Sequence, residues 1–373
     1  MDKALRNKAA IVGVGYTPMV RKAERSLWSF ALEAATEAIA DAGLRPEDID
    51  GYLGTPNAPN ASASHRDGVD EVSARSVIAG LGLKAPKFFM DHGGFPTTAL
   101  GVAVQALHAG MCNYVLILRA MYNPVGIRYT RSDRSEVGGP EQFTVPYGLH
   151  PIGRHASWLR RYMHDTGATR EDVFDLVRAD RKHAQLNPHA YWRGKELSLE
   201  EYMASKWVYE PLCIYDCDIP LTAAGAVVVT TAERAKDAPH RPAYVAGFAN
   251  NAQPGASVFE ASGIDREDVG VAQLYDGFVM FIWYWLEYLG FCGEGDGHEF
   301  TRDGRIELGG ELPVNTFGGS LGEGRLHGMG HLREAAMQVM GRAGERQVVG
   351  VEHAIASSGF VWIPGTTVIL SAG

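Results

Sequence analysis

The feature that most constrains the fold is an alternation of short apolar runs with longer segments of helical periodicity. The strand-like runs of the first part of the chain lie at 8–14, 49–53, 87–90 and 114–118. Between them, 26–42 and 97–108 carry apolar residues at helical spacing. Strands that alternate with helices are typical of an α/β sheet. The segment 97–108 is apolar on nearly every side, which predicts a helix buried all round.

A second round of this pattern begins near Arg241. Tyr244–Phe248 resembles Ile11–Gly15 in its mixture of apolar residues and glycine. The pair Gly318–Gly319 precedes a helical segment, as Gly93–Gly94 does. The members of each pair lie at similar distances along the chain, so the sequence predicts a duplicated α/β unit. Two such units, each with one buried central helix, predict an α/β fold in the form of a five-layer αβαβα sandwich.

The chain therefore divides into a first half at 1–235 and a second half at 236–373. Residues from about 122 to 220 interrupt the strand pattern of the first half. They are rich in Arg, His, Tyr and Trp, and show helical periodicity near 152–165 and 170–185. We interpret this stretch as an inserted cap rather than as a linker.

Composition argues against several classes of protein. The net charge is -9 and no long basic run is present, so we expect no nucleic-acid partner. Four cysteines in 373 residues do not make a disulfide scaffold. Cys213 and Cys217 stand alone as a pair, which argues against a zinc site. No signal-peptide pattern and no apolar run of membrane-spanning length occurs, so we expect a soluble, cytoplasmic protein without membrane insertion.

Several local patterns are weak markers of binding sites. An anionic substrate would need basic patches, for which Arg160–Arg161 and Arg181–His183 are candidates, although a solvated helix face explains each more simply. Gly13–Gly15 lacks the third glycine of a dinucleotide fingerprint, so no nicotinamide site is predicted. Gly318–Gly322 matches a nucleophile elbow around Ser320, but short matches are common in a glycine-rich chain.

Two histidines and one tyrosine are stronger candidates for chemistry. His327 and His331 are four apart, a spacing that places them on one face of a helix, but the glutamate of a zinc protease motif is missing. The alternative is that one histidine lies at a helix N-terminus while the other packs. Tyr275 and Asp276 follow a strand and precede an aromatic helix, where side chains can face a cleft. A phenol can act as acid or base, and a buried tyrosine with a backbone partner is an equally common arrangement.

Taken together, several segments resemble the thiolase superfamily, in particular the sterol-carrier-protein-x type thiolases. They occur in the same order along essentially the whole chain, and they are Arg161–His164, Arg181–Ala184, Asn187–Pro188, Asp216–Asp218, Tyr275–Phe278, Leu312–Gly319 and Glu334–Gln338. The catalytic cysteines of thiolases are missing, since no cysteine lies between Asp91 and Leu107. Without a thiolate, the acyl-enzyme of a thiolase cannot form by the usual route.

This set of losses resembles one branch, the steroid side-chain-cleaving aldolases. The resemblance implies a retro-aldolase that splits a β-hydroxy acyl-CoA, such as a steroid side-chain thioester, into a ketone and a short acyl-CoA such as propionyl-CoA. It implies that Tyr275, aided by Asp276, is the acid or base. Arg325 stands where a second tyrosine is usual, and His327 follows it.

Glycines would complete such a site, because they let backbone N–H groups approach a ligand closely. Gly93, Gly94, Gly318 and Gly319, together with His327, are the candidates for binding the enolate oxygen. The chain itself is expected to bind no cofactor and no metal, and the substrate would arrive as a CoA thioester. The resemblance also implies a homodimer through the N-terminal half and a small OB-fold, zinc-ribbon partner that completes a heterotetramer.

Two other functions are compatible with the same residues. One is a non-catalytic subunit of thiolase type that binds acyl-CoA or lipid. The other is an acyltransferase with an unusual nucleophile, for which Ser320, Thr97 and Thr98 are candidates.

Overall fold

The computed structural model describes residues 3–55, 72–84, 86–92, 94–123, 139–147, 149, 151–250, 257–361 and 365–373. Its strands are β1 (Ala9–Tyr16), β2 (Gly51–Thr55), β3 (Phe88–Asp91), β4 (Tyr114–Met121), β5 (Trp207–Tyr209), β6 (Leu212–Cys213), β7 (Ala223–Thr231), β8 (Ala243–Asn250), β9 (Val271–Gln273), β10 (His353–Ser358) and β11 (Thr366–Ser371). Its helices are α1 (Leu27–Asp41), α3 (Ala74–Leu81), α4 (Pro96–His108), α5 (Pro151–Thr166), α6 (Arg170–Gln185), α7 (Leu199–Met203), α8 (Ser257–Ser262), α9 (Phe281–Leu289), α10 (Gly297–Phe300), α11 (Gly319–Gly322) and α12 (Met329–Val339).

Nine strands form one mixed sheet in the order β3-β2-β4-β7-β1-β8-β11-β10-β9. From the β3 edge to β1, the pairings are parallel, parallel, antiparallel and antiparallel. From the other edge, Val314 pairs parallel with β9, and the sheet continues parallel to β10, antiparallel to β11 and antiparallel to β8. Each half therefore repeats the same strand order, which agrees with the predicted duplication.

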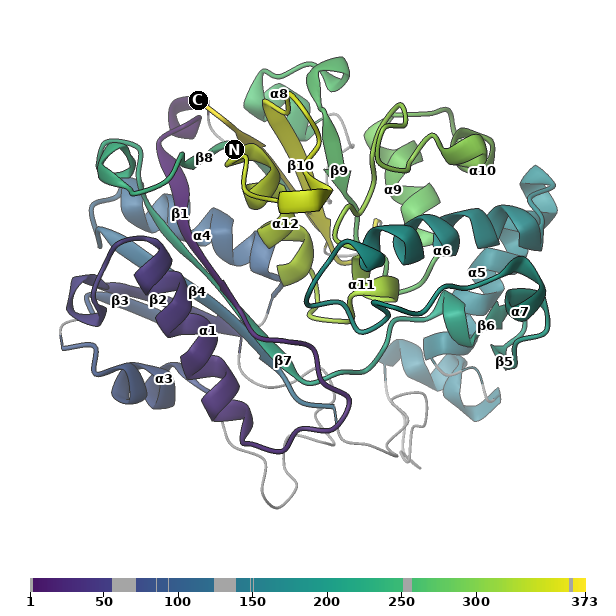
Figure 1. Ribbon diagram of the computed structural model, residues 1–373, viewed down its shortest axis with the longest axis horizontal. Coiled ribbons are helices and arrows are strands. Elements are labelled where there is room, and N and C mark those ends of the chain that lie inside the picture. The colour runs from purple at the N-terminus through teal and green to yellow at the C-terminus, as the bar shows by residue number, and fades with distance from the viewer. Residues whose placement is uncertain are drawn as a thin grey trace.

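The two halves meet where β1 and β8 pair through Ala10 with Tyr244 and Ile11 with Ala243. This short pairing joins the strands of both halves into the one nine-stranded sheet (Figure 1). Helix α1 covers β1, β4 and β7, while α8 covers β8 and β11. Helices α4 and α12 contact each other and strands of both halves, as two central helices of a layered fold must.

Local sequence explains the main elements of the first half. The hydroxyl of Ser26 accepts a hydrogen bond from the backbone N–H of Ser29 and caps α1, and Gly43 leaves the helix with φ 71°. Gly13 and Gly15 lie under α1, where an added Cβ would stand 2.2 Å from the carbonyl oxygen of Ala38 or 2.1 Å from that of Ala34. These glycines are therefore needed for close packing of strand on helix.

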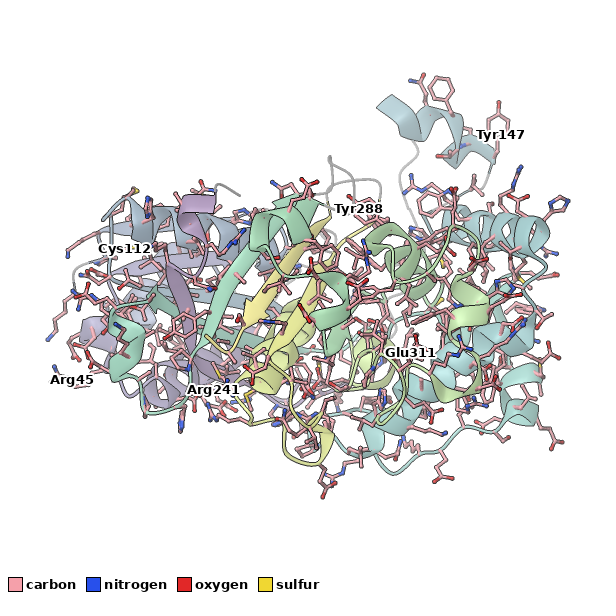
Figure 2. All side chains as sticks on the ribbon, turned by 90° about the horizontal axis from the view of Figure 1, so that it is seen from above. Arg45, Cys112, Tyr147, Arg241, Tyr288 and Glu311 are labelled. Atoms are coloured by element: carbon pink, nitrogen blue, oxygen red, sulfur yellow. The ribbon has the colours of Figure 1, made fainter. Side chains whose placement is uncertain are left out.

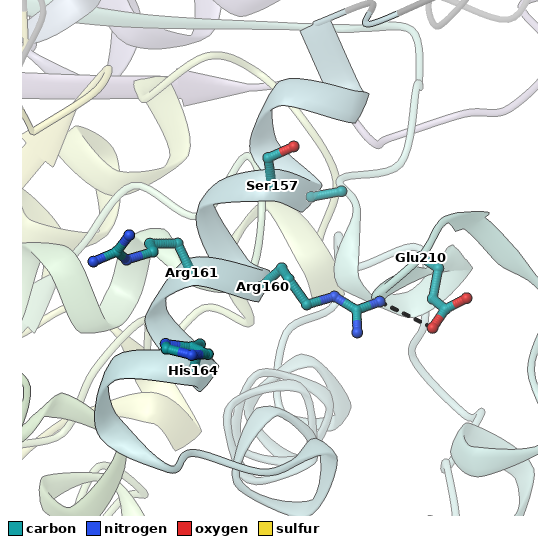
Figure 3. A pocket seen from close by; sticks show the side chains of 6 residues that line it. Ser157, Arg160, Arg161, His164 and Glu210 are labelled. Atoms are coloured by element: carbon teal, nitrogen blue, oxygen red, sulfur yellow. Dashed lines mark hydrogen bonds and ion pairs between the residues drawn. The ribbon is translucent and has the colours of Figure 1, made fainter.

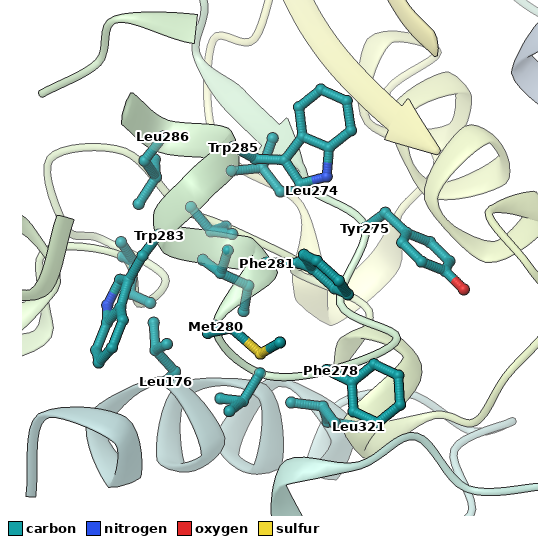
Figure 4. Close-up of a cluster of buried hydrophobic side chains, with 14 of the residues drawn as sticks. Leu176, Leu274, Tyr275, Phe278, Met280, Phe281, Trp283, Trp285, Leu286 and Leu321 are labelled. Carbon is teal, nitrogen blue, oxygen red and sulfur yellow. The ribbon is translucent and has the colours of Figure 1, made fainter. Parts of the chain in front are cut away.

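The predicted cap at about 122–220 contains α5, α6, α7 and the hairpin β5–β6. The cap shares a hydrophobic core with α9, the aromatic helix that follows Tyr275 (Figure 4). Phe281, Trp283 and Trp285 of α9 are fully buried. The cap thus packs over the end of β9, where the candidate residues gather.

Tyr147 lies on a segment that projects away from the body of the molecule (Figure 2).

Candidate active site

Tyr275 lies just beyond β9, with only 5% of its surface exposed. Its backbone N–H donates a hydrogen bond to Ser357 Oγ at 2.9 Å, which ties it to β10. Its ring lies 5.9 Å from that of Phe95 and 5.6 Å from that of His331. A Cβ on Gly277 would meet the Tyr275 hydroxyl at 2.8 Å, so this glycine makes room for the phenol. A hydrogen bond from the Tyr275 backbone to a side chain of β10 and close ring packing therefore hold the phenol in place.

Two buried arginines and two carboxylates act on this phenol. Burial raises the pKa of Tyr275 and the charges of Asp218 and Asp276 add to the rise, whereas Arg325 and Arg119 oppose it. Arg325 donates to Asn123 Oδ1 at 3.0 Å, and its Nε lies 3.6 Å from Asp218 Oδ2. Burial lowers the pKa of Arg119 to about 10, which leaves it positively charged at neutral pH. The phenol is thus neutral at rest, and the surrounding cations favour negative charge on it.

Arg119 also determines which nitrogen of His327 carries the proton. Arg119 Nη2 lies 3.0 Å from His327 Nδ1. A guanidinium can only donate, so Nδ1 accepts and the proton of the neutral ring resides on Nε2. Burial, with the charges of Arg119 and Arg325, holds the pKa of His327 well below its usual range. His327 is therefore a neutral donor through Nε2, in a backbone conformation with φ 45° that non-glycine residues rarely adopt.

Asp276 is turned toward the start of α11 and toward α12. Its carboxylate accepts hydrogen bonds from the backbone N–H groups of Ser320 at 2.8 Å and Leu321 at 3.0 Å, and from His331 Nε2 at 2.9 Å. Burial alone would raise the pKa of Asp276, but these donors lower it below its ordinary value. Burial and the Asp276 charge raise the pKa of Asp180, which neighbours it, well above normal. The contacts of Asp276 thus anchor α11 and orient His331.

The four candidate glycines differ in what surrounds them. Gly93 lies outside the described residues. The N–H of Gly94 donates to His92 Nδ1 at 2.9 Å. Gly318 and Gly319 open α11 with φ 101° and 62°, and an added Cβ on Gly319 would stand 2.2 Å from Asp276 Oδ2. In the structure, Gly94 therefore donates a hydrogen bond to a neighbouring side chain, and Gly319 leaves space for the Asp276 carboxylate.

The two histidines do not share one helix face as their spacing predicts. Gly328, with φ 89°, precedes the first residue of α12, so His327 lies outside the helix and His331 inside it. The alternative interpretation, a histidine at a helix N-terminus and a second that packs, is confirmed. Within the described ranges, no group of three His, Cys, Asp or Glu side chains is placed to hold a metal ion.

Of the other candidate nucleophiles, Ser320 and Thr97 are buried among protein atoms, whereas Thr98 is partly buried. Ser320 is 1% exposed and lies in the single turn of α11. Thr97 is fully buried, and its hydroxyl is hydrogen-bonded to that of Thr366. Burial raises the pKa of the Cys217 thiol well above its normal value, so the thiolate is disfavoured. The thiol of Cys217 instead donates to the carbonyl oxygen of Cys213 at 3.6 Å.

Arg119, Asn123, Asp218 and Ser357 contribute to this site, and the sequence did not identify their roles. Arg119 offers a signal in retrospect, because it is the only charged residue in the buried strand β4, YVLILRAM. A charge in a strand that is otherwise apolar is rarely tolerated without a function or a partner. Asn123, Asp218 and Ser357 carry no comparable signal, since polar residues are common near strand ends and loops.

The two basic patches named from the sequence differ in exposure, the first lying at the surface and the second largely buried. Arg160 and Arg161 line a surface hollow of ≈ 450 Å³ on α5, together with His164 and Glu210 (Figure 3). Both arginines already pair with carboxylates, Arg160 with Glu210 at 2.9 Å and Arg161 with Asp165 at 2.6 Å. In the second patch, Arg181 and His183 are buried while Lys182 pairs with Glu307. The second segment is therefore largely structural.

Comparison with known proteins places these observations in a family. Residues 236–372 match the family described as thiolase C-terminal domain-like. The 17-hydroxy-3-oxo-4-pregnene-20-carboxyl-CoA lyase of Mycobacterium tuberculosis is 36% identical over 98% of this chain and 100% of its own. The steroid side-chain-cleaving aldolase of Thermomonospora curvata is 34% identical over 99% of each chain. The solved Ltp2-ChsH2(DUF35) aldolase superposes with a TM-score of 0.87 at 33% identity, covering 98% of each chain.

In the part of the chain that is described, no helix combines the length and the apolar character that crossing a bilayer requires.

Proposed function

The chain belongs to the thiolase superfamily, in the family of the steroid side-chain-cleaving aldolases, and we propose that it cleaves a β-hydroxy acyl-CoA by a retro-aldol reaction. The substrate class is a steroid side-chain CoA thioester whose hydroxyl is on the carbon β to the thioester carbonyl. The bond between the α and β carbons breaks, and the products are a ketone and a short acyl-CoA such as propionyl-CoA. The hydroxyl proton ends on the α carbon, so the reaction consumes no co-reactant.

The observation that carries this proposal is the charge distribution around Tyr275. The phenol is neutral at rest, and the charges of Arg119 and Arg325 favour its ionised form. Tyr275 reacts from its ionised form: after loss of its proton to solvent, the phenolate takes the hydroxyl proton as the carbon–carbon bond breaks. The phenol formed in this way then gives a proton to the α carbon of the enolate, so Tyr275 acts as base and then as acid.

The thioester enolate needs donors that are fixed before the reaction. His327 offers its Nε2–H, because Arg119 occupies Nδ1. Arg325, where the family usually has a tyrosine, supplies positive charge near the same phenol. We assign it to electrostatic stabilisation of the enolate rather than to proton transfer, because an arginine does not release its proton near neutral pH.

Asp276 and the glycine pair Gly318–Gly319 are assigned to positioning. Asp276 holds the first turn of α11 and orients His331, whose ring packs near Tyr275. Gly319 leaves the space that the Asp276 carboxylate fills. Gly93 and Gly94 remain proposed neighbours of the thioester, on the segment that leads into α4.

The quaternary structure and layering are proposed on separate grounds. The edge strand β3 exposes Phe89 and Met90, which supports a homodimer through the N-terminal half. The Ltp2-ChsH2(DUF35) aldolase supports a small OB-fold, zinc-ribbon partner that would complete a heterotetramer. The shared contacts of α4 and α12 support the five-layer αβαβα arrangement.

The boundary between 1–235 and 236–373 follows the β7–β8 connection, with the cap inside the first half.

The decisive experiment follows product release from a 17-hydroxy steroid side-chain CoA ester. The protein, with and without a DUF35-type partner, should release the 17-ketone and propionyl-CoA, measured by chromatography and mass spectrometry. Tyr275→Phe should fold normally and lose at least 99% of kcat, because no other phenol is assigned to the reacting proton. Tyr288→Phe, on the nearby helix α9, is the matched control and should keep its activity.

The same experiment separates the alternatives. Tight binding of the thioester without products in any combination of proteins would indicate a non-catalytic binding subunit. A covalent acyl adduct in the intact mass would indicate an acyltransferase. Full activity of Tyr275→Phe would exclude Tyr275 as the proton carrier.

A further inference from the structure

His155, on helix α5 of the cap, has buried ring nitrogens that the proposed chemistry does not use. It is 4% exposed, and within the described residues neither Nδ1 nor Nε2 has a hydrogen-bond partner. A buried polar group without a partner costs about 1–3 kcal/mol. Such groups are uncommon in native proteins, and each needs an explanation.

Four aromatic side chains enclose this imidazole, and we call them the aromatic cage. The ring centroids of Phe278 and Phe360 lie 4.2 and 5.6 Å from that of His155 at small interplanar angles, so they cover its faces. Trp158 and Phe281 meet it edge-on at 4.9 and 5.5 Å. A phenylalanine or leucine would fill such a cage without the cost of burying two polar nitrogens.

A role as a pH sensor does not explain His155 either. Burial, with a smaller contribution from Arg154, lowers the pKa of His155 to about 3. The ring therefore stays neutral throughout the physiological range. A neutral imidazole presents one N–H donor and one acceptor nitrogen, which together suit a carbonyl or hydroxyl oxygen.

The aromatic cage adjoins the candidate active site along two segments of the chain. Phe278 is three residues beyond Tyr275, and both belong to one buried cluster (Figure 4). Phe360 is two residues beyond Ser358, whose buried hydroxyl also lacks a partner among the described residues. An added Cβ on Gly328 would stand 2.1 Å from that hydroxyl, so Ser358 lies next to the turn that carries His327.

Two walls of the cage lie nearer the surface than the other two. Trp158 and Phe360 are only partly buried, whereas Phe278 and Phe281 belong to the buried core. Aromatic walls that end at a neutral hydrogen-bonding group match a flat, apolar ring system that carries one oxygen.

We propose that the aromatic cage binds the ring system of the acyl-CoA substrate, and that His155 donates a hydrogen bond to a ring ketone or hydroxyl remote from the bond that is cleaved. This inference rests on the proposed function and adds a specificity-determining residue to it. The ligand class is a polycyclic acyl thioester with an oxygen on its distal ring. Specificity arises because an analogue without that oxygen leaves the imidazole unpaired.

The test compares two CoA thioesters that differ only in the presence of a ketone on the distal ring. In His155→Phe, kcat/KM for the ketone substrate should fall about tenfold or more, while kcat/KM for the analogue without the ketone stays within about twofold. The melting temperature should stay the same or rise, because the phenyl ring fills the cage without buried nitrogens. His164 is an exposed histidine on the same helix, so His164→Phe is the matched control. This control should leave kcat/KM for both substrates unchanged.

Binding measurements keep this test independent of turnover. Calorimetric Kd values for both thioesters, with wild-type protein and His155→Phe, report the same preference even if no bond is cleaved. A wild-type preference for the ketone that His155→Phe abolishes supports the inference, including when the retro-aldol proposal fails. Equal losses for both thioesters, or no loss for either, would overturn it.

Discussion

Arg119 and Arg325 bring two positive charges into the interior next to a neutral phenol. Arg325 has Asp218 and Asn123 as partners, whereas Arg119 has the neutral ring of His327 and, among the described residues, no carboxylate within ion-pair distance. Burying a cation without a counter-ion is costly. The arrangement therefore favours negative charge that arises during the reaction, on the phenolate of Tyr275 or on the enolate.

Replacing Arg119 tests its influence on His327. Arg119→Met should lower kcat about 10- to 100-fold with little change in KM, because it removes a positive charge and releases Nδ1, so that either nitrogen of His327 can carry the proton. Arg119→Lys should recover part of the rate. Nitrogen-15 NMR of the His327 ring should show a proton on Nε2 in the wild type and a mixture of tautomers in Arg119→Met.

Arg241→Met removes an exposed arginine that pairs with Glu352 and serves as the control. A kcat of Arg119→Met equal to that of the wild type would contradict the assigned role, and so would an unchanged ring tautomer.

Single residues were predictable where they belong to a contiguous motif. Tyr275 opens a segment that resembles the family, and His327 follows closely after Arg325, so the sequence named both as candidates. The contacts of Asp276 were not predictable, because its three donors come from Ser320, Leu321 and His331, more than forty residues away. The partner of Arg119 was hidden for the same reason. Their roles depend on how the two halves fold together.

At the scale of elements, the short helix α11 is fixed by a carboxylate at its first turn. Asp276 accepts two of its backbone N–H groups, as a capping residue does from within a helix's own sequence. Gly318 and Gly319 both have positive φ, so the chain reaches this turn through conformations that favour glycine. A helix of this length is not stable alone, so α11 depends on its contact with the Asp276 carboxylate.

Substituting Gly319 tests this contact. Gly319→Ala should lower the free energy of unfolding by roughly 2–4 kcal/mol, because the new Cβ strains a residue at φ 62° and displaces the Asp276 carboxylate. Gly341→Ala is matched in φ, at 73°, but has open space around it, and should cost only about 1 kcal/mol. Urea denaturation measures both. Equal losses of unfolding free energy in the two variants would show that the Asp276 carboxylate moves aside without an energetic cost.

Element types were predicted well, and boundaries less so. Helix α4 and the strands β1 and β4 lie within a few residues of their predicted positions. Near the end of the chain, a turn through Gly350 with φ 76° separates the apolar pair Val348–Val349 from β10, which begins at His353. The helix that corresponds to α4 is α12, not the single turn after Gly318–Gly319. Apolar periodicity does not reveal such local left-handed turns.

At the scale of the whole molecule, the sheet has one edge that exposes apolar side chains. Phe89 and Met90 of β3 are 58% and 40% exposed, which is unusual for an unpaired edge strand. A second copy of the chain would cover this edge, in line with the proposed homodimer. The sequence predicted the repeat of the halves but not their junction, because only two residue pairs join β1 to β8 and neither has a distinctive pattern.

Charge at this edge should separate the subunits. Phe89→Lys should convert a dimer into a monomer in light scattering at micromolar concentration, because a buried ammonium without a partner opposes association. Val349→Lys, at a position that is 96% exposed, is the control and should leave the mass unchanged. A wild-type monomer, or a Phe89→Lys variant that remains dimeric, would rule out β3 as the interface.

Because the two halves share their central helices, the proposed catalytic groups come from distant parts of the chain. Arg119 belongs to β4, while Tyr275, Arg325 and His327 follow more than 150 residues later and Ser357 lies on β10. A ribosome that has released only the first half has therefore produced no reactive centre at all. A chain still being synthesised cannot cleave its substrate early, and activity should appear abruptly once β11, the strand that joins β10 to β8, has left the exit tunnel.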